Sequence, residues 1–177
     1  MNRAARLLGG RIAYAAAGVA LLAWAPIERP APRVPLGAAA LIGTAVGSAV
    51  FALLARRLPP LARPIVARAV TIVAPVVALG AAGEEAVWRF GALRGLEPAL
   101  GSTGALALST VGFAAAHLGR APFRALPTHL LTGAAFACAY VLTGRLVAAV
   151  VAHVVYNVLV VAACAAWLSP GDGEAAA

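Results

Sequence analysis

Long apolar runs, separated by short polar stretches, occupy most of the chain. A helix needs about 20 apolar residues to cross a bilayer, with a range of roughly 17 to 25. Six runs approach or reach this length, and they cover residues 12–27, 34–55, 69–83, 99–116, 125–144 and 146–171. Because lipid cannot satisfy backbone hydrogen bonds and the runs lack the alternation of barrel strands, each run predicts a helix. The pattern therefore predicts an all-α fold, a polytopic transmembrane helical bundle with about six spans.

The first apolar run has two interpretations. Arginines precede its apolar core and Ala23-Trp24-Ala25 follows the core, which is also the pattern of a signal peptide with an A-x-A cleavage site. The other five runs predict membrane helices under either interpretation.

Composition places the chain among integral membrane proteins. Hydrophobic residues make up 63% of its 177 residues and charged residues 11%, with a mean hydropathy of +0.92, values outside the range of an ordinary soluble domain. All 14 basic residues are arginine, and the formal charge is +8. Because most of the arginines flank the apolar runs, we interpret this charge as contact with lipid headgroups, with no nucleic-acid partner.

The distribution of arginine also indicates an orientation. Arginines at the N-terminus and the group Arg56, Arg57, Arg63 and Arg68 favour the cytoplasmic side, which places the 28–33 loop outside.

Small residues within the runs carry weaker signals. Gly43 and Gly47 form a GxxxG pattern that permits close contact between two helices. Cys138 and Cys164 show no CxxC or metal-ligand spacing, so we interpret them as small buried residues.

Polar residues inside the apolar segments fall into three short patterns. The first is Glu84-Glu85-x-x-x-Arg89, in which Glu85 and Arg89 share a helix face with the acid N-terminal to the base, the better order for an ion pair. Glu84 has no partner of this kind. A charged side chain at bilayer depth is costly, so Glu84 is by default a functional residue.

The other two patterns carry histidine. In Phe113-x-x-x-His117 an aromatic ring lies one helical turn from an imidazole. In His153-x-x-x-Asn157 an imidazole and a carboxamide project from one helix face and can donate to a common oxygen.

These three patterns, in this order on successive hydrophobic segments, resemble those of the CPBP family of intramembrane endopeptidases, which includes CAAX prenyl proteases and proteins linked to bacteriocin processing and immunity. The resemblance covers roughly residues 70 to 160. It implies a catalytic membrane core at 66–168, preceded by family-variable membrane helices at 1–65 and followed by a polar tail at 169–177.

The resemblance also implies roles for individual residues. Glu84 and His117 correspond to the pair that activates water, and His153 and Asn157 to residues proposed to stabilise the oxyanion. Glu85, Arg89 and Phe113 correspond to supporting positions. This chemistry is coherent in itself, because peptide hydrolysis needs a base for water, an acid for the leaving amine and donors for the tetrahedral oxygen.

The resemblance further implies a peptide or protein substrate at the membrane, such as a lipidated protein or a leader peptide. The arginine-only, alanine-rich composition favours a multi-pass protein of a bacterial inner membrane. We expect no cofactor.

Three alternatives use the same residues. Glu85 and Arg89 are also explained as a purely structural ion pair. Two histidines and a glutamate are a common zinc ligand set, although HExxH is absent. A non-catalytic scaffold or immunity protein would keep the motif residues as packing polar groups.

Depth counting creates a conflict. If the third helix is straight, Glu84 lies toward one face of the membrane. His117, at the end of the fourth helix, then lies toward the opposite face. Either Pro75 breaks the third helix or the fourth span starts later, and we expect Glu84, His117, His153 and Asn157 to line one polar cavity. His129 fits none of the patterns and is interpreted as an interfacial residue.

Overall fold

In the computed structural model, residues 3–55, 74–118 and 122–168 are described, and within these ranges the secondary structure is helical throughout, without strands. The all-α prediction is confirmed. The main helices are α1 (Arg3–Trp24), α2 (Leu36–Leu54), α4 (Ala74–Glu85), α5 (Gly95–Ala115), α6 (Leu126–Thr143) and α7 (Leu146–Leu168). A π-helix, η2 (Ala86–Arg94), joins α4 to α5, and a short 3₁₀ turn, η3 (Phe123–Ala125), precedes α6.

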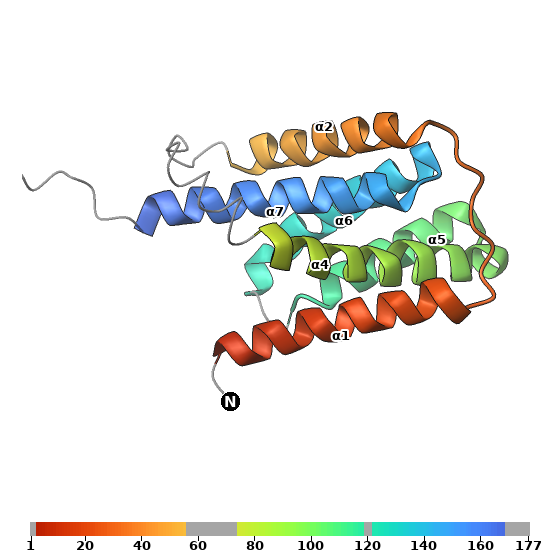
Figure 1. The fold of residues 1–177 in the computed structure, drawn as a ribbon, viewed down its shortest axis with the longest axis horizontal. Coiled ribbons are helices and arrows are strands. Elements are labelled where there is room, and N and C mark those ends of the chain that lie inside the picture. The colour runs from red at the N-terminus through yellow and green to blue at the C-terminus, as the bar shows by residue number, and fades with distance from the viewer. Residues whose placement is uncertain (1–2, 56–73, 119–121, 169–177) are drawn as a thin grey trace, which may run out of the picture.

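The helices run alternately up and down along one common direction (Figure 1). The segment from Pro75 to Ala115 is helical almost throughout, but its backbone reverses at Gly101, whose φ of 67° suits glycine. The two arms of this hairpin pack against each other, and α6 and α7 form a second hairpin with a left-handed glycine, Gly144, at its turn.

The described residues contain four helical segments that are long and apolar enough to cross a membrane, of which Pro75–Ala115 is the hairpin, and one shorter apolar helix, Ile12–Trp24. With the hairpin counted as two arms, the bundle matches the six predicted runs. In the structure, the helix runs on without a break from the third predicted run into the glutamate pair and η2. The helix continues through the polar residues of η2 because their charges are paired inside the bundle instead of facing lipid.

Glycines allow α2 to lie directly on α7. A Cβ at Gly43 would collide with the carbonyl oxygen of Ala148, and one at Gly47 with that of Ala152. The close contact expected from the GxxxG pattern is therefore present, with α7 as the partner helix. This contact fixes the helix that carries His153.

Cys138 is exposed on the outer face of α6, so its interpretation as a buried residue is wrong. An apolar helix in a membrane has hydrophobic residues on its lipid-facing side as well as its packed side, so hydrophobicity alone did not locate Cys138. The side chain of Cys164 and the arginines Arg56, Arg57, Arg63 and Arg68 lie outside the described residues, and the orientation inferred from those arginines stays a prediction.

Candidate active site

Three helices bring the predicted site residues to one cavity of about 250 Å³. Glu84 comes from the end of α4, His117 from the turn that follows α5, and His153 and Asn157 from successive turns of α7. All four line the cavity, as expected from the sequence.

The reversal at Gly101 removes the conflict in depth. Glu84 and His117 lie nearly equidistant along the chain from this glycine, so an antiparallel hairpin places them at the same level. The later start of the fourth span accounts for this arrangement. Pro75 lies in the first turn of α4 as the structure describes it and does not interrupt the helix beside Glu84.

Glu84 faces two imidazoles without bonding directly to either. Its Oε2 atom lies 3.9 Å from Nε2 of His117 and 3.9 Å from Nε2 of His153. These distances exceed a hydrogen bond, but one water molecule between the three groups can contact all of them. The Glu84 side chain is 13% exposed, so it is neither fully buried nor open.

The ring of His117 is held in one orientation by its own helix. Its Nδ1 lies 2.8 Å from the carbonyl oxygen of Phe113, one turn earlier. A carbonyl oxygen only accepts hydrogen bonds, so Nδ1 carries the proton. In the neutral ring the lone pair is then on Nε2, the atom nearest Glu84.

Glu85, next to Glu84, belongs to a fully buried polar cluster. Arg89 donates from Nε to Oε2 of Glu85 over 2.7 Å, which confirms the pairing expected from their spacing. Arg89 also donates from Nη1 to the hydroxyl of Ser109 over 3.2 Å, and that hydroxyl donates to the carbonyl of Trp88 over 2.6 Å. The cluster therefore links η2 to α5.

The same glutamate orients His153 on α7. Nδ1 of His153 lies 2.9 Å from Oε1 of Glu85, and the imidazole stacks on the ring of Phe136 with centroids 4.9 Å apart. Nδ1 therefore donates to the carboxylate, and Nε2 points toward Glu84. One carboxylate, Glu85, thus fixes both an arginine and a histidine.

Phe113 packs among the site residues. The guanidinium of Arg89 lies 5.1 Å from its ring centroid, a cation–π arrangement. The rings of His117 and His153 lie 4.8 and 5.9 Å from it. Phe113 is buried and forms a wall shared by the polar cluster and the cavity.

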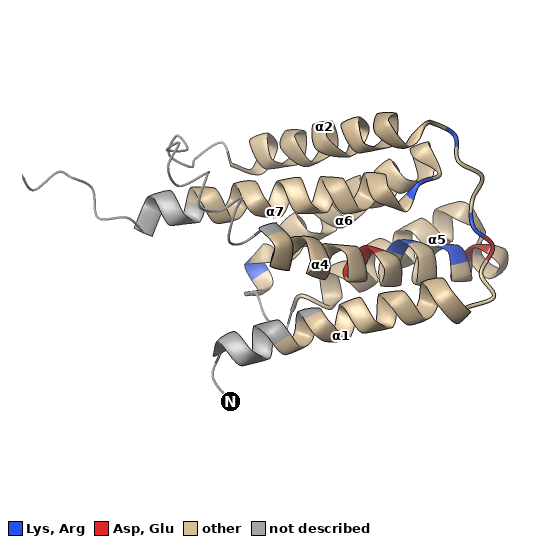
Figure 2. Cartoon of the chain, viewed as in Figure 1, with Lys and Arg blue, Asp and Glu red and all other residues tan. Residues whose placement is uncertain are grey.

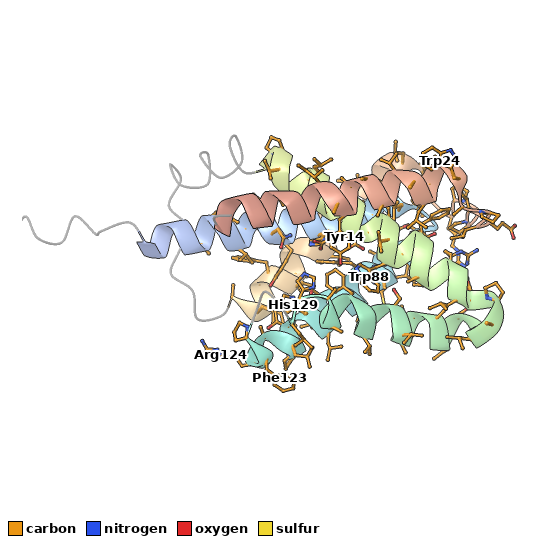
Figure 3. All side chains as sticks on the ribbon, turned by 90° about the horizontal axis from the view of Figure 1, so that it is seen from below. Tyr14, Trp24, Trp88, Phe123, Arg124 and His129 are labelled. Carbon is orange, nitrogen blue, oxygen red and sulfur yellow. The ribbon has the colours of Figure 1, made fainter. Side chains whose placement is uncertain are left out.

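His129 also lines the cavity, a position that its interpretation as an interfacial residue did not anticipate. Its ring stacks on that of His117, with centroids 4.3 Å apart and planes inclined by 22°. Figure 3 shows Phe123 and Arg124 at the outer edge of the bundle and His129 among the helices. The spacing along α6 also places His129 at the cavity. Thr132 and Phe136, three and seven residues later, lie on the same helix face and line the same cavity.

Metal binding was the main alternative for these side chains. Among the residues that the structure describes, no three or more His, Cys, Asp or Glu side chains are grouped so that they could hold one metal ion. The expectation that the protein needs no cofactor stays a prediction.

The chain was compared with models of known protein families. The family model described as "Type II CAAX prenyl endopeptidase Rce1-like" matches residues 66–159, just over half of the chain. This range includes the glutamate pair and all of the histidine patterns. No curated protein and no solved structure matches the chain.

Proposed function

The chain belongs to the Rce1-like family of type II CAAX prenyl endopeptidases, and on this premise we propose that it hydrolyses a peptide bond by means of a water molecule held between Glu84 and His117. It is an integral membrane protein with several apolar helices, so the reaction takes place within the bundle. The observation that carries the proposal is the position of Glu84, which faces two imidazoles across distances that suit one water molecule.

In the first step, Glu84 removes a proton from the water molecule. At the same time the water oxygen attacks the scissile carbonyl carbon. The lone pair of His117 at Nε2 accepts a hydrogen bond from the second water proton and so fixes the direction of attack. The carbonyl π bond breaks and leaves a tetrahedral oxyanion. Glu84 then passes its proton to the amide nitrogen, the carbon–nitrogen bond breaks, and the products are a carboxylic acid and an amine.

His153 and Asn157 are placed to stabilise the oxyanion. The carboxamide of Asn157 donates without any change of protonation. Donation from Nε2 of His153 requires a second proton on the ring, because Nδ1 already donates to Glu85. His153 therefore acts as an imidazolium in this step, with the Glu85 carboxylate beside it to balance the charge.

Glu85 and Arg89 act through position. One carboxylate oxygen of Glu85 binds the His153 ring, and the other binds Arg89. Arg89 also donates to Ser109 on α5. The ion pair thereby sets the distance between Glu84 on α4 and the histidine on α7.

The substrate is a peptide or protein at the membrane. Lipidated proteins, leader peptides and other membrane peptides are the classes we propose, and a bacterial inner membrane is the proposed location. The walls formed by Val77, Val160 and Val161 suit an apolar side chain or chain segment next to the scissile bond.

The test compares membranes from cells that carry wild-type protein or Glu84→Gln. Glutamine keeps the size of the side chain but cannot take a proton from water, so we expect peptides that are cut in wild-type membranes only. Quantitative proteomics of peptide termini measures this difference.

Arg124→Gln is the matched control, since Arg124 is exposed and lies outside the cavity. It should give the wild-type pattern. Identical peptide termini in wild-type and Glu84→Gln membranes, with equal amounts of folded protein, would contradict the proposal.

A further inference from the structure

The bundle has a second polar region at the end opposite the start of α6. The start of α6 carries His129, whereas its end carries Tyr140, about 16 Å further along the helix. Here the loop that follows α1 meets the turn at Gly144, and charged residues gather at this end in Figure 2. The charged residues near this loop are Glu28, Arg29, Arg33, Arg94, Glu97 and Arg145.

Positive charge exceeds negative charge in this region. Glu97 accepts bonds from Arg94 and from Ser102, one at each oxygen, so both of its oxygens are already used. Among the described residues, the guanidinium groups of Arg29 and Arg145 donate to the neutral carbonyls of Leu22 and Val34. Within the described part of the chain, the positive charges of Arg29 and Arg145 are therefore not paired with a carboxylate, and these two groups can contact an anion from outside the protein.

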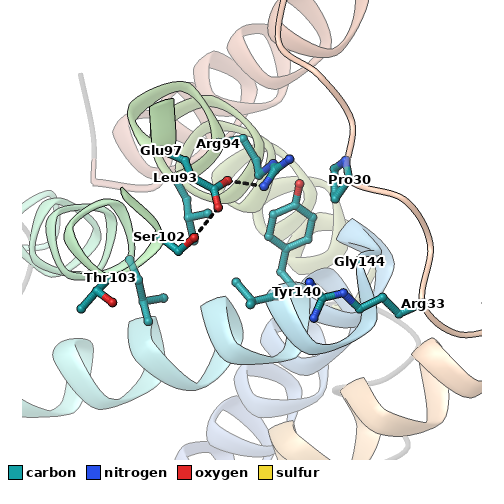
Figure 4. A pocket seen from close by; sticks show the side chains of 11 residues that line it. Pro30, Arg33, Leu93, Arg94, Glu97, Ser102, Thr103, Tyr140 and Gly144 are labelled. Atoms are coloured by element: carbon teal, nitrogen blue, oxygen red, sulfur yellow. Dashed lines mark hydrogen bonds and ion pairs between the residues drawn. The ribbon is translucent and has the colours of Figure 1, made fainter. Parts of the chain in front are cut away.

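A cavity of about 190 Å³ lies between these groups, and we call it the arginine cavity. Arg33, Arg94, Glu97, Ser102, Tyr140 and Gly144 are among the residues that line it (Figure 4). Tyr140 is only 2% exposed. Its hydroxyl has no hydrogen-bond partner among the described residues, and neither has the buried Nε of Arg94. A buried polar atom without a partner is costly, so both atoms indicate a missing ligand with acceptor oxygens.

A larger cavity of about 620 Å³ adjoins the arginine cavity and shares Pro30, Tyr140 and Gly144 with it. Arg29 and Arg145 lie on its lining beside apolar side chains, namely those of Leu22, Leu36, Phe90, Leu146 and Val147. An anionic group beside a long apolar surface is the chemistry of a phospholipid. The region also lies where α6 ends and where α2 and α7 begin, the level at which headgroups meet transmembrane helices.

We propose that the arginine cavity binds the phosphodiester of an anionic phospholipid, with an acyl chain along the adjoining apolar cavity. Arg33 and Arg94 contact the phosphate, and the Tyr140 hydroxyl donates to one of its oxygens. This site is independent of the proposed peptide hydrolysis, because none of its residues lines the cavity around Glu84.

The test measures lipid binding to the purified full-length protein by native mass spectrometry. The probes are phosphatidylglycerol, phosphatidylcholine and inorganic phosphate at equal concentration. We expect phosphatidylglycerol to bind most tightly. Tyr140→Phe should weaken its binding about tenfold, since a hydrogen bond to a charged group is lost, and Arg33→Gln should weaken it by a similar factor.

Both variants should fold normally. The Tyr140 hydroxyl has no partner to lose within the described protein, and Arg33 is exposed, so the melting temperature without added lipid should equal that of wild type. Arg124→Gln, an exposed arginine near the start of α6, is the control and should bind phosphatidylglycerol as wild type does.

Three results would overturn the proposal. Phosphatidylcholine that binds as tightly as phosphatidylglycerol would show that charge is not recognised. Inorganic phosphate that binds equally well would assign the cavity to a free anion. Unchanged lipid binding in both Tyr140→Phe and Arg33→Gln would place the lipid elsewhere.

Discussion

Glu84 and Glu85 are consecutive residues of α4 with opposite surroundings. Glu85 is completely buried, and its two oxygens bond to Arg89 and His153. Glu84 is partly exposed to a cavity, and its contacts to His117 and His153 are both 3.9 Å long. A buried charge with every partner in place holds helices together, whereas a charge that faces a cavity without close partners remains free to react. The comparison separates a supporting residue from a catalytic one within a single dipeptide.

The largest loss of stability should come from breaking the buried ion pair between Glu85 and Arg89. Arg89→Leu leaves the Glu85 carboxylate buried without its cation, and breaking a buried ion pair in this way typically costs about 3–5 kcal/mol. We expect a lower free energy of unfolding in detergent micelles, measured by thermal or chemical unfolding.

The double variant Glu85→Leu and Arg89→Leu is the control. It removes both charges, so it should recover most of the stability that Arg89→Leu loses. An Arg89→Leu protein as stable as wild type would show that the pair does not support the bundle.

The next largest effect concerns the rate. Asn157→Ala removes one donor to the oxyanion, and loss of such a donor typically lowers kcat about 100- to 1,000-fold. We expect little change in melting temperature, because Asn157 faces the cavity. Steady-state cleavage of an identified peptide measures the effect.

Thr132→Ser is a suitable control for Asn157→Ala. Thr132 lines the same cavity, and serine keeps the hydroxyl that donates to the carbonyl of His129. Its kcat should stay near that of wild type. Full activity in Asn157→Ala would remove Asn157 from the mechanism.

The smallest effect should arise at His129, whose ring stacks on that of His117. An aromatic stack contributes about 0.5–1.5 kcal/mol, so His129→Ala should lower kcat by roughly two- to tenfold. His129→Phe keeps a flat ring and should restore most of the rate.

The two His129 variants distinguish a positioning residue from a proton carrier. A phenyl ring can stack but cannot carry a proton. Equal losses in His129→Ala and His129→Phe would therefore contradict the stacking role.

Much of this fold follows from hydrophobicity alone, because helices are the simplest way to satisfy backbone hydrogen bonds in lipid. Hydrophobicity alone does not account for the charges beside and within η2, because Arg89 is charged and yet fully buried in the bundle, where it pairs with Glu85. The separate third and fourth runs predicted that the chain reverses between them, but not that it does so at Gly101, because one glycine among many gives no sign of its φ.

The site was predictable where local spacing carries the information. Glu85 with Arg89, and His153 with Asn157, lie four residues apart on one helix, so their alignment follows from helix geometry. The stacking of His129 on His117 depends on how α6 packs against the end of α5, which no local pattern encodes.

The most direct test of the account is a paired measurement on purified Glu84→Gln. We predict that single-turnover cleavage of an identified peptide falls about 100- to 10,000-fold, as expected for loss of a general base, while the melting temperature stays at the wild-type value. A Glu84→Gln protein that cleaves at the wild-type rate would show that the carboxylate of Glu84 does not activate water, and would contradict the account.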